Sequence, residues 1–128
     1  MIDRTTRETS QLLKDVGFPQ PSPGNGQIWY LCRFPDGNAR HWVEVLGSSI
    51  NRIDDPNLLI FAPTAADILK ELGKNFMLNH VVSSDTPAFV VLEWAEAGIS
   101  TIRIMREWIH TNSAEVAAAC WLAKNEKK

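Results

Sequence analysis

Two runs rich in aromatic and β-branched residues flank the segment Pro35–Asn38, and this arrangement restricts the fold more than any other feature of the sequence. The runs cover residues 27–34 and 39–46. Residues of these types favour strands, and the intervening Pro-Asp-Gly-Asn is a strong turn signal. The sequence therefore predicts a β-hairpin whose turn is centred on Asp36 and Gly37.

Signals for three helices share one form, a capping residue followed three positions later by a carboxylate. Runs of strands have helices between and after them, which favours an α+β fold over a regular alternation of strand and helix. We expect an antiparallel sheet of five or six strands packed with N-terminal, central and C-terminal helices. The expected helices are residues 4–16, 64–72 and 112–124, and the further strands are residues 57–62, 76–82 and 88–94.

Residues 99–109 fit two patterns. Apolar residues recur at helical spacing from Ile99 to Ile109, whereas the alternation of Ile102 and Ile104 and the β-branched content are typical of a strand. A turn at residues 96–98 precedes the segment. We expect a strand here.

A chain of 128 residues, 45% of them hydrophobic and 22% charged, is typical of one globular domain over residues 1–128. The net charge of −2 makes a dedicated nucleic-acid binder an unfavoured class. Residues 1–10 are mostly polar and charged and lack the apolar region of a secretory signal. No apolar run reaches the roughly 20 residues of a membrane span. Cys32 and Cys120 lie in apolar runs, as reduced, buried thiols do. We expect a cytoplasmic protein without membrane contact.

Motifs for cofactor and metal binding are missing from the sequence. Gly24–Gly26 lacks the third glycine of a dinucleotide-binding loop and precedes an expected strand rather than a helix. The histidines and cysteines are scattered singly, whereas a structural zinc site needs four such ligands. We therefore expect no cofactor, no metal and no enzymatic activity.

The expected hairpin register brings aromatic and basic residues to one face. Side chains alternate between faces along a strand, and the turn decides which residues lie opposite each other. Aromatic rings beside arginines are typical of binding hot spots and of platforms on which bases stack. This face is a candidate binding site, unless a helix covers it. Its residues are Trp29, Leu31, Arg33, Arg40 and Trp42.

The last expected helix is apolar on nearly all sides. Between Ala114 and Ala123 only Glu115 is polar. Such a helix must be covered on more than one side, so it lies either at the centre of the fold or against another subunit. In the second case Ala114, Ala118 and Trp121 are the candidate contacts of a homodimer.

The chain contains LLKDVGFPQP at residues 12–21, FAPT at residues 61–64 and AEVAAACWLA at residues 114–123. With these segments, in this order, it resembles a group of small uncharacterised proteins of phages, prophages and bacteria. The segments are helix caps, a turn and a core helix. The resemblance implies a bacterial or phage cytoplasmic origin and carries over no activity.

The sequence favours a non-enzymatic accessory or interaction protein, with a homodimer or another protein as its partner. The alternative is a weak nucleic-acid-contacting module that uses the Trp29 and Trp42 face. A thiol enzyme is the least favoured function. It rests on the expected register, which places Cys32 opposite His41, because a histidine can generate a thiolate nucleophile from a neighbouring cysteine.

Overall fold

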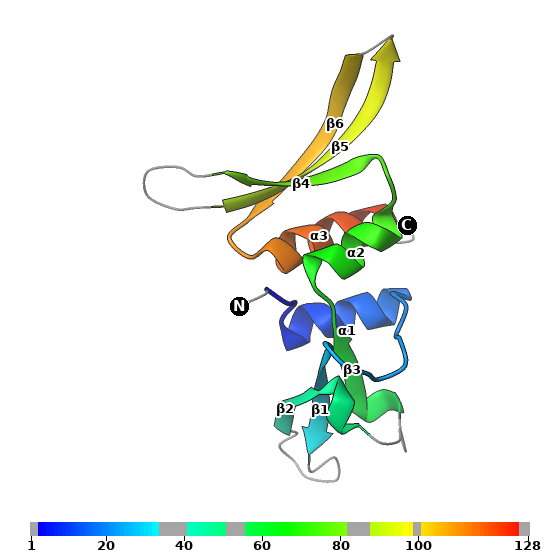
Figure 1. Cartoon of the computed structure of the whole chain (residues 1–128), viewed down its shortest axis with the longest axis vertical. Coiled ribbons are helices and arrows are strands. Elements are labelled where there is room, and N and C mark those ends of the chain that lie inside the picture. Colours follow the sequence, from blue (N-terminus) through cyan, green and yellow to red (C-terminus); the bar gives the residue numbers. More distant parts are fainter. Residues whose placement is uncertain (1–2, 34–40, 51–55, 82–87, 99–100, 126–128) are drawn as a thin grey trace. The chain divides into compact units, whose positions relative to one another are not determined.

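A computed structural model describes residues 3–33, 41–50, 56–81, 88–98 and 101–125 of the chain (Figure 1). These residues form three α-helices and six strands. The predicted α+β class is confirmed. The strands make two antiparallel sheets of three strands each, and so they do not form the single sheet that the sequence predicted. The chain divides into two compact units.

The N-terminal unit, Thr5–Pro63, combines one helix with a sheet in the order β2-β1-β3. The central strand β1 pairs with β2 along one edge and with β3 along the other. All four residues of β3 are buried, as expected of a continuous apolar run. The elements are α1 (Arg7–Val16), β1 (Ile28–Arg33), β2 (His41–Leu46) and β3 (Leu59–Ala62), with short 3-10 turns at Gly47–Ser49 and Pro56–Leu58.

Helix α1 begins at Arg7 rather than at residue 4, and its cap lies one residue later than predicted. The hydroxyl of Thr6 accepts a hydrogen bond from the backbone N–H three residues on, so Thr6 and not Thr5 is the N-cap. Thr5 is fully buried, and its N–H donates to the carbonyl oxygen of Pro63 at 3.2 Å. Its burial explains why Thr5 does not cap: it anchors the start of the unit to the segment after β3.

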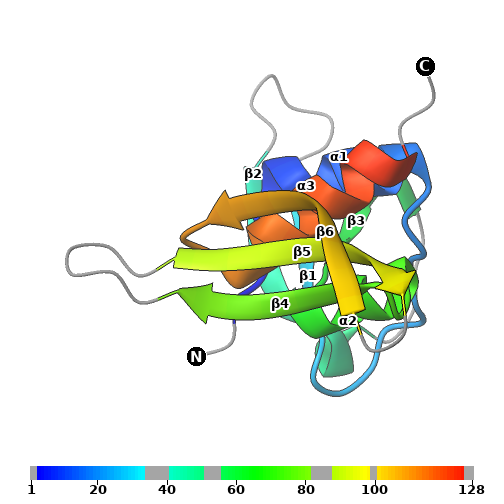
Figure 2. The ribbon, with the colours of Figure 1, turned by 90° about the horizontal axis from the view of Figure 1, so that it is seen from above.

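The C-terminal unit comprises Thr64–Lys128 together with Met1–Arg4. Its sheet has the order β4-β5-β6, and α3 packs on β5 and β6 and against α2. Figure 2 shows the strands in front of α3. The strand expected over residues 99–109 is confirmed by β6 for residues 101–109; residues 99 and 100 lie outside the described residues. The elements are α2 (Ala65–Leu72), β4 (Phe76–Val81), β5 (Ala88–Gly98), β6 (Thr101–His110) and α3 (Ser113–Asn125).

Both helices of the C-terminal unit begin at their predicted caps. The hydroxyl of Thr64 accepts from the N–H of Asp67, and the Asp67 carboxylate accepts from the N–H of Thr64 at 3.0 Å. At α3, Asn112 Oδ1 accepts from the N–H groups of Ala114 and Glu115 at 2.8 and 3.0 Å. These bonds satisfy donors that the first turn of a helix leaves without backbone partners.

Candidate functional site

The register of the hairpin differs by one residue from the expected one. Arg33 pairs with His41 and Cys32 pairs with Trp42. Seven residues separate Arg33 from His41, and an odd number does not fit a turn centred between Asp36 and Gly37. A shift of one residue moves the side chains of one strand to the other face. Trp29 and Trp42 therefore lie on opposite faces of the sheet, and the prediction that they share one face is wrong.

Trp29 belongs to the core of the N-terminal unit. Its side chain is 2% exposed, and its ring packs on that of Phe61 at a centroid distance of 5.4 Å and an angle of 52°. The indole N–H donates to Gln27 Oε1 at 2.9 Å, so its polar group is satisfied inside the fold. Leu31, on the same face, is half-buried. Trp29 is therefore covered by other parts of the chain, and it is not available on the surface as a binding residue.

Trp42 lies on the other face and is half-buried. The guanidinium of Arg7, from α1, lies 5.4 Å from the centroid of its ring, within the range of a cation–π contact. A cation beside this tryptophan thus comes from helix α1. Sequence reasoning missed Arg7 because the contact joins two distant elements. Arg33 ends β1, and Arg40 lies outside the described residues.

The expected Cys32–His41 pair is not formed. Cys32 shares a face with Trp42 and is 4% exposed, whereas His41 lies on the opposite face and is exposed. A catalytic thiolate needs its base within hydrogen-bond reach. The register therefore removes the geometry on which the thiol enzyme rested.

The three candidate dimer contacts in α3 are buried within the C-terminal unit. Ala114 and Ala118 are fully buried, and Trp121 is 6% exposed. Helix α3 packs on β5, β6 and α2, and Lys124 at its end forms an ion pair with Glu93 of β5 at 2.9 Å. This burial matches the central position that was one of the two expectations for an all-apolar helix.

The sheet of the C-terminal unit has two different faces. Val91 is fully buried, and Glu93, two residues on, pairs with Lys124, so α3 covers the face that carries these residues. The opposite face carries Val90 and Leu92 of β5. Ile109 of β6 and the exposed Asn79 of β4 are register partners of Val90, and Met77 of β4 is a register partner of Leu92. We call the four apolar residues among these the outer face. Ile109 is 64% exposed, Leu92 and Met77 are half-buried, and Val90 is buried.

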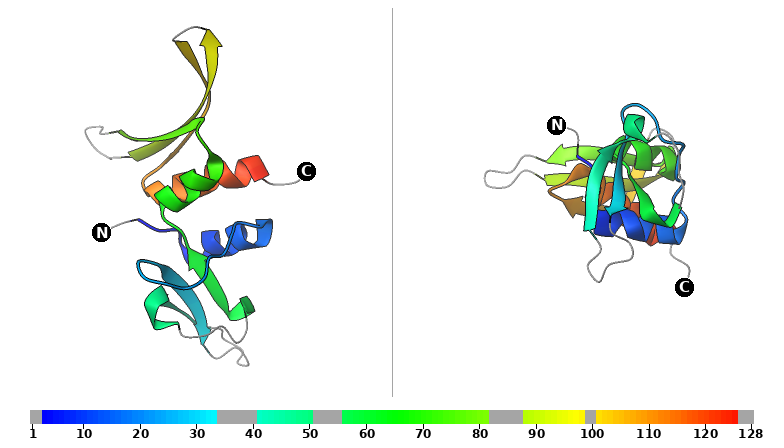
Figure 3. Two further views of the ribbon diagram at one scale, coloured as in Figure 1. Left: turned by 45° about the vertical axis from the view of Figure 1, so that its right-hand side comes forward. Right: turned by 90° about the horizontal axis from the view of Figure 1, so that it is seen from below.

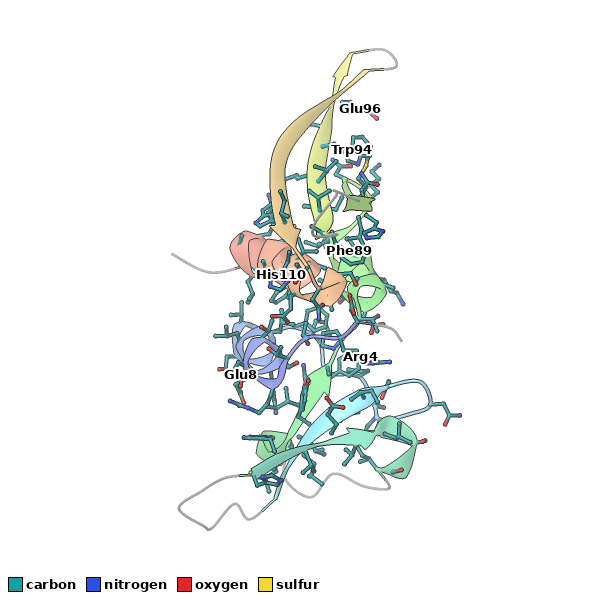
Figure 4. All side chains as sticks on the ribbon, turned by 90° about the vertical axis from the view of Figure 1, so that its left-hand side faces the viewer. Arg4, Glu8, Phe89, Trp94, Glu96 and His110 are labelled. Carbon is teal, nitrogen blue, oxygen red and sulfur yellow. The ribbon has the colours of Figure 1, made fainter. Side chains whose placement is uncertain are left out.

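β5 and β6 continue beyond β4 as a two-stranded arm. The last pair between β4 and β5 is Phe76 with Glu93, whereas β5 and β6 pair as far as Gly98 with Thr101. Figure 3 shows the arm curving away from the end of β4, and Figure 4 labels Trp94 and Glu96 on this part of β5. The register shifts after Glu93 and after Glu96, and such bulges bend a strand pair.

A row of three rings crosses the sheet near its junction with α3. His80 stacks on Phe89 at a centroid distance of 4.7 Å, and His110 lies opposite Phe89 on the next strand. Figure 4 shows Phe89 and His110 on their neighbouring strands. With Phe89 between them, the two imidazoles are separated by two strand spacings, about 10 Å, which is too far for one metal ion. His110 Nδ1 instead accepts from the N–H of Asn112 at 2.9 Å.

Comparison of the chain with family models, curated proteins and solved structures finds no match. Among the described helices, none is long and apolar enough to cross a membrane. The functional argument therefore starts from the outer face and the arm.

Proposed function

We propose that this protein is a non-enzymatic interaction protein that associates with a second copy of itself through the β4-β5-β6 sheet. The observation that supports this most is the outer face. Ile109 exposes 64% of its surface there, on the same face as the half-buried Leu92 and Met77. An apolar side chain of this size is stabilised by about 1.5–3 kcal/mol when it is fully buried.

The edge of the sheet supports the same proposal. β6 lies at one edge of the order β4-β5-β6, and ten residues of its backbone run along that edge. An edge strand presents N–H and C=O groups that another strand can pair with. A second copy that pairs there extends the sheet and brings two outer faces side by side.

The observed hairpin register gives no support to the two other functions considered, nucleic-acid contact and thiol catalysis. Trp29 and Trp42 lie on opposite faces, so the stacking platform expected for nucleic acid is not assembled. Cys32 and His41 also lie on opposite faces, so these two residues do not form a nucleophile–base pair.

Sedimentation of the wild type, of Ile109→Arg and of Leu46→Arg tests the proposal. Leu46 is the matched control, because it is a strand residue of the other unit with a similar exposure of 57%. We expect a wild-type dimer at micromolar concentration, a dissociation constant raised at least about tenfold by Ile109→Arg, and no change for Leu46→Arg. Circular dichroism checks that each variant is folded.

A wild-type protein that stays monomeric at high micromolar concentration contradicts self-association. An equal weakening by Leu46→Arg contradicts the assignment to the outer face.

A further inference from the structure

The N-terminal unit contains a pocket of about 230 Å³ that the sequence did not indicate. It lies on the side of the sheet where Trp29 is buried, and the loop after α1 contributes to its wall. Its lining residues are Lys14, Gln20, Pro21, Trp29, Pro56 and Leu59.

One glutamine fixes the start of this loop against β3. Gln20 Oε1 accepts from the N–H of Phe61 at 3.0 Å, and Gln20 Nε2 donates to the carbonyl oxygen of Phe18 at 3.2 Å. Pro21 follows directly and has a restricted backbone of its own. The wall of the pocket is thereby held in place without a ligand.

A second glutamine fixes the other end of the loop. Gln27 Oε1 accepts from the N–H of Gly24 at 2.8 Å and from the indole N–H of Trp29 at 2.9 Å, while Gln27 Nε2 donates to the carbonyl oxygen of Ser22 at 3.1 Å. A side chain at Gly47 would collide with the backbone of Gly24, so the loop packs closely at this point. The pocket is therefore preformed, as small-molecule sites usually are.

The polar side-chain groups of the lining residues are hydrogen-bonded to the protein itself. The ammonium group of Lys14 donates to the carbonyl oxygens of Pro56 and Leu59, at 2.8 Å in the case of Leu59. The amide of Gln20 and the indole N–H of Trp29 are engaged as described above. What the pocket offers to a ligand is thus mainly the apolar surface of two prolines, a leucine and an indole edge. An anion would meet an ammonium group that already donates to two backbone carbonyls, so its lost hydration would be only partly compensated.

The volume restricts the ligand to one or two rings. An apolar cavity of about 150 Å³ holds benzene, whereas sites for drug-sized ligands begin at about 300 Å³. Aromatic faces carry partial negative charge and pack well on C–H groups and on the edges of other rings. From the size and lining, we infer that this pocket binds a small uncharged aromatic molecule in the range from benzene to indole. This inference is independent of the proposed self-association.

NMR titration of the full-length protein with indole tests the inference. We expect saturable shifts of the Trp29 indole N–H and of the Gln20 side-chain amide. Indole-3-carboxylate, which has the same ring and a negative charge, should bind at least about tenfold more weakly. Cyclohexanol, which is similar in size but not flat, should also bind more weakly.

Two proline variants localise the binding. Pro21 lines the pocket, whereas Pro23 belongs to the same loop and is not among the lining residues. We expect Pro21→Ala to weaken indole binding at least about fivefold and Pro23→Ala to change it less than about twofold. Equal effects of the two variants, or no saturable shift with indole up to about 5 mM, overturn the inference. Binding of cyclohexanol as tightly as indole overturns the aromatic preference.

Discussion

Two tryptophans of one hairpin have opposite environments, although the sequence treats them alike. Trp29 is covered on its face of the sheet, stacks on Phe61 and satisfies its N–H through Gln27. Trp42 is half-buried, and the Arg7 guanidinium lies over its ring. Whether a strand side chain belongs to the core or to the surface depends on which helix or loop packs over that face of the sheet. The alternation of residues along a strand does not show such a contact.

Replacing each tryptophan with alanine should show this difference in a urea melt. Trp29→Ala should lower the free energy of unfolding by about 3–5 kcal/mol, because it leaves a cavity beside Phe61 and leaves the Gln27 amide without one donor. Trp42→Ala should cost about 1–2 kcal/mol, because less surface is buried and the cation–π contact contributes about 1 kcal/mol or less. Equal losses for the two variants would contradict the assignment of Trp29 alone to the core.

At the scale of elements, local signals predicted the structure well and non-local ones did not. The caps Thr64 and Asn112 were predictable because a cap is a contact between residues three positions apart. The hairpin register was not, because it depends on the number of residues that the connection uses. The division into two sheets was not predictable either, since a strand run does not reveal which strand it pairs with.

The cap of α2 provides a quantitative test of such a local signal. Thr64→Ala removes the hydroxyl that accepts from Asp67 N and should cost about 1 kcal/mol, within the range of 0.5–2 kcal/mol for caps. Thr64→Ser keeps the hydroxyl and should cost less than about 0.5 kcal/mol. Urea unfolding of both variants against the wild type measures the difference. If serine is as costly as alanine, the methyl group of Thr64 and not its hydroxyl stabilises the start of α2.

At the scale of the whole molecule, the outer face, the arm and the pocket belong to different units. The outer face and the arm lie in the C-terminal unit, and the pocket lies in the N-terminal unit. The N-terminal unit, Thr5–Pro63, is about the size at which an isolated domain buries only some 60% of its surface and is marginally stable. Its stability therefore depends on whether it unfolds together with the rest of the chain.

The chain path predicts that the two units unfold as one. The chain passes between them twice, at Arg4–Thr5 and at Pro63–Thr64. The two crossing segments are joined to each other within each unit. In the C-terminal unit Arg4 forms an isolated bridge with Thr64, and in the N-terminal unit the N–H of Thr5 donates to the carbonyl oxygen of Pro63. Losing the N-terminal unit frees both segments, which should destabilise the start of α2.

Hydrogen exchange of the Trp29→Ala variant tests this coupling, because Trp29 lies in the N-terminal unit alone. If the units are coupled, protection of the slowest amides should fall by the same factor in β1 and in β5, since both exchange through global unfolding. A loss of about 3 kcal/mol corresponds to a factor of more than 100 in protection. If only the β1 amides lose protection, the units unfold separately and the chain is not the single cooperative domain that its length suggests.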